Sequence, residues 1–349
     1  MTTVAFDAVW TGDGFRCAPS FRIDGDLLRP ARDDSRHALR VGGTLFPRLT
    51  DHHVHLGLID ATTLVAGGIT HVIDLGWTPA VAAGWLADDP SRPSTAIAGA
   101  LLTAPGGYPS RSGWAPRDAA REVGGARDGR AAVREQVMAG ASCIKVALNS
   151  DAGQTVDDVT LRAIVEEAAR AGLPVVVHAQ GVGQVERAVR VGVDRLAHAP
   201  FSERVPDAVI ADAVRSGMSW ISTLDIHGWG TPSRAHGTAV DNLRRFHTAG
   251  GRVLYGTDLG NGPLPLGPNA RELAALLEAE LDATTVLRAI AGAPGDDHLL
   301  RGAPIGPLFA WVPESPPVDP SLLPEWLATA RGLRTPSLDQ PLPTEGMRP

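Results

Sequence analysis

The single lysine of this chain lies inside an apolar segment. Lys145 stands in residues 143–148, a short hydrophobic run typical of a buried strand, although the chain has 32 lysine and arginine residues in total. A buried amine loses its proton readily, whereas a guanidinium stays charged. The neutral amine can form a Schiff base or react with carbon dioxide to give a carbamate. The alternative is a structural lysine whose ammonium group reaches water at the strand end.

Four histidines and one aspartate also follow apolar segments. His53 and His55 are two residues apart, so on a strand their side chains point to the same face. His178, His198 and Asp258 each follow a further apolar run. Imidazole nitrogens and carboxylate oxygens are common ligands of divalent metals. Each residue alone is more often a hydrogen-bonded core histidine or a turn-capping aspartate, but jointly with the buried lysine they predict a metal site.

Alternating apolar strands and helices position these residues. Strands buried on both faces and separated by helices are expected in a parallel sheet. The eight expected strands are 45–55, 69–75, 95–102, 143–148, 174–178, 194–198, 218–224 and 252–255. Eight such units favour an α/β fold of the (β/α)8 TIM-barrel type, in which the carboxyl ends of the strands converge on one face. An open doubly wound sheet is the alternative, but no glycine-rich dinucleotide loop follows an early strand.

The two ends of the chain are expected to form a second, smaller domain. Short segments of β character near the N-terminus are separated by turn sequences such as Asp24-Gly25-Asp26. The proline-rich C-terminal segment can pair with these strands before it ends in a tail. We therefore expect a small β-sandwich domain from residues 1–48 plus 304–349, and a barrel over residues 49–303.

Composition and charge limit the function classes. The formal net charge of −7, with 20% charged and 44% hydrophobic residues, is that of an ordinary globular protein. The sequence shows no basic cluster for nucleic acid, no apolar run of about 18 residues and no signal-peptide pattern. Cys17 and Cys143 are too few for a disulfide framework or a cysteine zinc site. We expect a cytoplasmic protein with a small-molecule substrate and no nucleic-acid or membrane partner; whether it forms a homo-oligomer is left open.

Five segments resemble the amidohydrolase superfamily, most closely its imidazolonepropionase-like and prolidase-like branch. In the expected order they are residues 46–56, residues 67–76, Ile144-Lys145-Val146, Val177-His178-Ala179 and Gly256-Thr257-Asp258. The resemblance extends from about residue 3 to about residue 310. It implies a distorted barrel with a β-sandwich built from both chain ends.

The resemblance also implies a cofactor and a mechanism. It implies two divalent metal ions, zinc being the expected one, and a hydroxide between them that attacks the substrate. The implied ligands are His53, His55 and Asp258 for one ion, His178 and His198 for the other, and Lys145, carbamylated by carbon dioxide, as the bridge. Asp258 would shuttle the proton, and Asp258, Lys145 and His198 are the expected catalytic residues.

The expected reaction is cleavage of an amide C–N bond in a small cyclic amide, an N-acyl amino acid or a dipeptide. A lactone or ester hydrolase with the same site, a mononuclear deaminase and a non-catalytic binding module are the alternatives. Gln180 occupies the position, two after His178, where deaminating relatives tend to carry an acid, so the deaminase is disfavoured. The complete ligand set argues against a binding module.

Residues in the loops after the strands are expected to contact the substrate. Tyr108 could hydrogen-bond a developing oxyanion and Arg111 could pair with a substrate carboxylate, although surface packing explains both equally well. His227 and Asn261 are further candidates, because they follow the seventh and eighth strands. The histidines not expected to take part are His37, His52, His71, His247 and His298.

Overall fold

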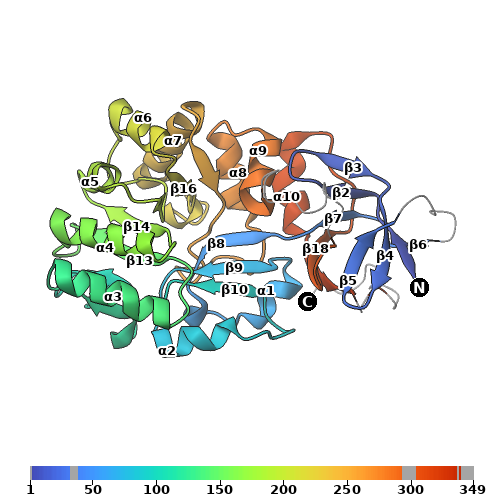
Figure 1. Cartoon of the computed structure of the whole chain (residues 1–349). Helices are drawn as coiled ribbons and strands as arrows, with labels where there is room; N and C mark the ends of the chain where they lie inside the picture. Colours follow the sequence, from blue (N-terminus) through green and yellow to red (C-terminus); the bar gives the residue numbers. More distant parts are fainter. Residues whose placement is uncertain (1, 32–37, 293–303, 336–337, 339–349) are drawn as a thin grey trace.

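The computed structural model describes residues 2–31, 38–292, 304–335 and 338. It shows a parallel β barrel surrounded by helices, with a β domain at one side (Figure 1). The barrel strands are β8 (Thr50–Val54), β9 (His71–Asp74), β10 (Ser94–Ile97), β11 (Leu101–Thr103), β13 (Ile144–Asn149), β14 (Val175–Gln180), β15 (Arg195–Leu196), β16 (Ser219–Ile221) and β17 (Arg252–Leu254), with β12 (Ala120–Glu122) beside β11. The barrel that the sequence predicts is therefore confirmed.

The strands form a closed ring because hydrogen bonds join the two parallel sheets at both edges. At one edge, β10 leads directly into β11, and the Ser142 amide donates to the Ile97 carbonyl over 2.8 Å, next to the start of β13. At the other edge, the His52 amide donates to the Tyr255 carbonyl over 3.0 Å, and β8 bridges to Leu259 beyond β17. The expected third strand, 95–102, is thus divided into β10 and β11.

Helices cover the outer face of the barrel (Figure 1). In the described residues they are α1 (Thr62–Ala66), α2 (Pro79–Ala82), α3 (Ala126–Met138), α4 (Asp158–Arg170), α5 (Gln184–Val191), α6 (Asp207–Arg215), α7 (Arg234–Thr248), α8 (Ala270–Glu278), α9 (Ala283–Ala291) and α10 (Leu323–Ala328). Polar side chains fix several starts: Asp157 accepts from the Thr160 amide at α4, and Ser233 accepts from the His236 amide at α7. None of the helices in the described ranges is long and apolar enough to cross a membrane.

The barrel interior is filled by a layer of apolar side chains below the carboxyl ends of the strands. This layer contains Cys143, directly before β13, and Val176 of β14, together with Leu75, Ala98, Ala197, Ile221 and Leu254. Side chains two residues apart on a strand share a face, so Lys145 and His178 stand directly above Cys143 and Val176. The strand period therefore sets both polar side chains at the functional end of the barrel.

Both ends of the chain build the β domain, as the sequence predicts. One sheet has the order β5-β4-β1-β6 and the other β19-β18-β7-β2-β3. The strands are β1 (Thr3–Ala5), β2 (Ala8–Trp10), β3 (Phe15–Cys17), β4 (Ser20–Asp24), β5 (Leu27–Pro30), β6 (Leu39–Arg40), β7 (Thr44–Phe46), β18 (Leu308–Val312) and β19 (Arg331–Arg334). Because β18 pairs with β7, the C-terminal segment closes a sheet that the N-terminal segment begins.

The structure differs from the sequence expectation at two further places. The expected strand 45–55 is interrupted after Phe46, so β7 joins the β domain and β8 joins the barrel; Pro47, which has no amide N–H to donate to a sheet, follows β7 directly. The C-terminal segment also contains α10, which packs against α8 of the barrel. The expected domain limit at residues 303 and 304 and the expected tail after 338 involve residues outside the described ranges.

Candidate metal centre and substrate cavity

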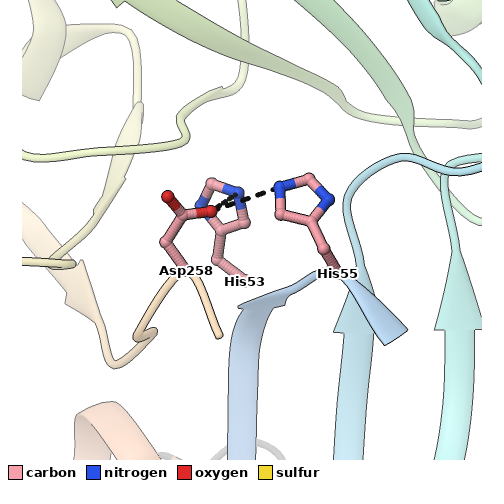
Figure 2. A group of neighbouring side chains, drawn as sticks. All are labelled: His53, His55 and Asp258. Atoms are coloured by element: carbon pink, nitrogen blue, oxygen red, sulfur yellow. Dashed lines mark ion pairs between the residues drawn. The ribbon is translucent and has the colours of Figure 1, made fainter. Parts of the chain in front are cut away.

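Two histidines and an aspartate converge at the end of the first barrel strand (Figure 2). The Nε2 atoms of His53 and His55 lie 3.0 and 3.2 Å from the same oxygen, Oδ1 of Asp258. The opposite ring nitrogens face backbone acceptors: Nδ1 of His53 is 2.8 Å from the Ala197 carbonyl, and Nδ1 of His55 is 3.1 Å from the Gly76 carbonyl. These carbonyls favour a proton on Nδ1 of each ring, so Nε2 is the atom that each ring can offer to a metal ion.

This convergence fits a bound cation. Two lone pairs facing a carboxylate oxygen repel one another unless a proton or a metal ion lies between them. Burial and the nearby charge of Lys145 together lower the pKa of His53 to about 4. Burial opposes the charged form of Asp258, but His53 and His55 hold the pKa of that carboxyl well below its usual range. The carboxylate is thus negative and His53 neutral at pH 7, a donor set suited to a divalent metal.

A second pair of nitrogens converges beside the first group. Nδ1 of His178 and Nε2 of His198 lie 2.9 Å apart, and neither ring is more than 9% exposed. The other nitrogen of His198 is 2.9 Å from Oγ1 of Thr223, and that of His178 is 3.1 Å from Oε1 of Gln180. Burial lowers the pKa of His178 to about 3 and that of His198 well below its usual value. Both imidazoles are therefore neutral and able to coordinate a metal.

Lys145 lies close to both groups, because its charge acts on His53 of the first group and on His178 and His198 of the second. Its side chain is 1% exposed, and its Nζ is 3.5 Å from Nε2 of His53. Burial lowers the pKa of Lys145 to about 8, although the charge of Asp258 opposes this shift. A neutral amine is thus available near neutral pH, and a neutral amine is the form that reacts with carbon dioxide.

The loop after β17 holds Asp258 in a defined orientation. Asp258 has a positive φ of 57°, a left-handed conformation that aspartate tolerates better than most residues. Its Oδ2 accepts a hydrogen bond from Nδ2 of Asn261 over 2.9 Å, so Oδ1 is the oxygen left facing the histidines. The backbone of the loop is joined to the first strand, because the His55 amide donates to the Leu259 carbonyl over 2.8 Å.

A cavity of about 440 Å³ opens above these residues. Tyr108 and Trp114 of the loop after β11 cover it from one side, with Tyr108 stacked on His178 at a centroid distance of 5.2 Å and Trp114 5.1 Å from the His55 ring. Burial raises the pKa of Tyr108 to about 12, so its hydroxyl stays protonated and can donate a hydrogen bond. The candidate metal ligands thus form the floor of a partly aromatic cavity.

Comparison with known proteins agrees with this geometry. Residues 44–293 match the model of the amidohydrolase family. The chain belongs to the amidohydrolase family. It is therefore an enzyme of a hydrolase family that acts on C–N bonds, and the buried His53, His55 and Asp258 form a metal-binding group of the kind this function uses.

Solved structures share the fold of this amidohydrolase. A Xaa-Pro dipeptidase with bound methionine has 22% sequence identity and a TM-score of 0.70, and the match covers 93% of this chain and 96% of that chain. The ochratoxinase of A. niger has 18% identity and a TM-score of 0.74, covering 96% and 94%. A putative prolidase from Bifidobacterium longum has 22% identity and a TM-score of 0.73, covering 93% and 91%. No curated protein matches the chain.

Of the substrate contacts predicted from the sequence, three line the cavity of the amidohydrolase and one does not. Tyr108, His227 and Asn261 line it. Arg111 does not line the cavity. It is exposed and lies against Gly106. Because the loop turns its side chain outward, the structure gives no support to pairing between Arg111 and a substrate carboxylate.

In the part of the chain that the structure describes, the histidines not expected to take part lie away from the metal-binding group. Nδ1 of His52 contacts the Tyr255 carbonyl at 2.9 Å, and His52 lines a separate cavity together with His71. His247 lies on α7, on the outside of the barrel. His37 and His298 lie outside the described residues.

Sequence reasoning overlooked Thr223, which supports the histidine pair. Its hydroxyl contacts Nδ1 of His198, and its φ of 45° is unusual for a β-branched residue. Such strained positions gather at functional sites. The only signal in the sequence was that Thr223 ends the seventh expected strand, which places it at the carboxyl end of the barrel.

Replacing Thr223 with valine tests this support. Valine keeps the shape but removes the oxygen that orients the His198 ring, so we expect Thr223→Val to weaken metal binding about 10- to 100-fold. The measurement is a metal titration against a competing chelator. Thr223→Ser keeps the hydroxyl and is the matched control. An unchanged affinity in Thr223→Val would show that His198 needs no such partner.

Proposed function

We propose that this amidohydrolase hydrolyses an amide C–N bond in a small molecule with the help of two divalent metal ions, zinc being the expected metal. One ion would be held by His53, His55 and Asp258 and the other by His178 and His198. The convergence of both histidine pairs, Asp258 and the buried Lys145 on one cavity is the observation that carries the proposal.

The bridge between the two groups would be Lys145 as its carbamate. A carbamate needs a neutral amine and a site that shields it from bulk water, and Lys145 is buried and has a lowered pKa. Carbamylation would turn the one buried cation among the cavity-lining residues into an anionic oxygen ligand. When bound, the metal pair would supply a water-derived nucleophile at neutral pH and Lewis acidity for the substrate carbonyl.

Asp258 would move the proton during hydrolysis. Its carboxylate is ionised and lies at the floor of the cavity, where the attacking water must lose a proton. Asn261 donates a hydrogen bond to Oδ2 and so fixes the orientation of the carboxylate. Asp258 would then deliver the proton to the leaving nitrogen.

Tyr108 would act on the carbonyl side. Its phenol lies in the cavity, stacked on His178, and stays protonated at all physiological pH values. A hydroxyl in this position can donate a hydrogen bond to the oxygen that gains charge in the transition state. Asp258 would thus transfer the proton, and Tyr108 would stabilise the developing oxyanion.

The candidate substrates are a small cyclic amide, an N-acyl amino acid or a dipeptide. The structural neighbours named as a Xaa-Pro dipeptidase and a prolidase support this group. The experiment is a parallel assay of amides from all three classes and of lactones of similar size, with metal-loaded and chelator-treated protein. Metal-dependent cleavage of an amide supports the proposal. Cleavage of lactones alone would contradict it and would support an esterase.

A further inference from the structure

The upper wall of the cavity is apolar and aromatic. Above the floor of metal-binding side chains, the wall is built by six such residues: Leu58, Tyr108, Trp114, Phe201, Ile226 and Trp229. Of all residues that line the cavity, each of them within the described ranges, Lys145 is the only lysine or arginine, and it lies in the floor. The wall therefore offers no guanidinium or ammonium group to a bound substrate.

A substrate carboxylate would be poorly accommodated by such a wall. The scissile amide and the metal ions would occupy the floor of the cavity. A carboxylate elsewhere on the substrate must therefore lie against the wall. Removing a carboxylate from water without a cationic partner costs several kcal/mol. Arg111, the nearest candidate in the sequence, is exposed and does not line the cavity. Dipeptides and N-acyl amino acids carry a free carboxylate, whereas cyclic and simple amides do not.

One polar atom of the wall lacks a partner. Nε2 of His227 is buried and makes no hydrogen bond, and its ring packs on Phe201 at a centroid distance of 4.2 Å. A buried nitrogen without a hydrogen-bond partner destabilises the protein by its desolvation penalty, and a ligand that hydrogen-bonds to it offsets that penalty. The nitrogen belongs to a residue that lines the cavity, so a bound substrate is the available partner.

The loop that carries His227 is held in place before any substrate binds. The carboxylate of Asp225, two residues earlier, accepts hydrogen bonds from Arg271 at 2.8 Å and from Nδ2 of Asn269 at 2.7 Å. On the other side, Nε1 of Trp229 donates to the Asn261 carbonyl over 3.1 Å. These bonds tie the loop after β16 to the start of α8 and to the loop after β17, so His227 has a fixed position.

We infer that the cavity selects an uncharged amide with an aromatic or branched apolar substituent, and that Nε2 of His227 hydrogen-bonds a polar group of the bound amide. This inference rests on the proposed function and narrows it to cyclic and simple neutral amides. Substrates with a free carboxylate, such as dipeptides and N-acyl amino acids, would bind much more weakly.

The test compares two probes of the same shape and different charge, N-acetylphenylglycinamide and N-acetylphenylglycine, with both enantiomers of each. Dissociation constants are measured by ligand-observed NMR on metal-loaded protein, and hydrolysis is measured in parallel. We expect the neutral amide to bind about 100-fold more tightly than the acid. Equal or tighter binding of the acid overturns the inference, and so does the failure of both probes to bind.

Two matched pairs of variants test why the neutral amide is preferred to the acid. Leu58 is 37% exposed at the cavity and packs on Gly260. Leu58→Arg adds the missing cation and should strengthen binding of the acid at least about tenfold, whereas the neutral Leu58→Gln should not. His227→Phe should weaken binding of the amide about tenfold, and His227→Gln, which keeps a hydrogen-bonding group, should retain it. An unchanged preference in both Leu58→Arg and His227→Phe contradicts the inference.

The binding and hydrolysis readouts separate this inference from the proposed function. If the neutral probe binds preferentially but no amide is cleaved, the selectivity stands and the proposed function fails. If both probes are cleaved equally well, the proposed function stands and the inference is overturned.

Discussion

Replacing Lys145 with alanine is expected to lower kcat/KM for an amide substrate by about 10³-fold or more, with little change in fold. The loss follows from removing the proposed bridging ligand, because Lys145 lines the same cavity as both histidine groups and is close to each. The barrel should persist, since alanine leaves the apolar layer around Cys143 intact. Steady-state kinetics and the metal content of the purified variant measure the effect.

Chemical rescue and a matched control make this prediction specific. Short carboxylic acids should restore part of the activity of Lys145→Ala, because they can replace the carbamate oxygens. Lys145→Arg keeps a cation but cannot form a carbamate in the same way, so it should be as inactive as the alanine variant. Cys143→Ala changes the apolar layer two residues before Lys145 and should retain activity. Full activity in Lys145→Ala would refute the bridging role.

Asp258→Asn is expected to lower kcat about 10²- to 10⁴-fold, the range associated with loss of a general acid–base group. Asparagine keeps the shape and an oxygen that can accept the hydrogen bond from Asn261, but it can neither take up the proton nor supply the negative charge. Kinetics on protein saturated with metal separates the loss of proton transfer from a loss of metal affinity.

Asn261→Ala is the control for Asp258. It leaves the carboxylate in place and removes the hydrogen bond that orients it, so we expect a loss of about tenfold, smaller than that of Asp258→Asn. A pH–rate profile gives the second readout: the Asp258→Asn variant should lose the acidic limb that the Asn261→Ala variant keeps. Equal losses and identical profiles in the two variants would mean that Asp258 only holds the metal.

The strands of the barrel and the side chains at their ends could be predicted from the sequence for a physical reason. Strands of a parallel sheet are buried on both faces, so they appear as apolar runs such as Val175-Val176-Val177, and a polar residue such as His178 at the end of a run stands out. The period of two then places His53 and His55 on one face, as the structure shows.

Features that depend on the path of a loop could not be predicted in this way. The loop after β11 places Tyr108 over His178 but turns Arg111 outward, and neither direction follows from residue type. The contact of Thr223 with His198 joins two different strand ends, so only the folded barrel reveals it. The division of the expected strand 45–55 between two sheets likewise depends on tertiary structure, since β7 pairs with β18 and β8 pairs with β9.

The proposed pair of metal ions bridged by Lys145 is tested by the metal content per chain, measured by elemental analysis on protein purified without chelators and in the presence of bicarbonate. We expect a value near two for the wild-type protein and a lower value for Lys145→Ala, because Lys145 would supply a ligand to both ions. A value near one in the wild-type protein, unchanged in Lys145→Ala, would contradict the bridged pair and would favour a mononuclear centre at His53, His55 and Asp258.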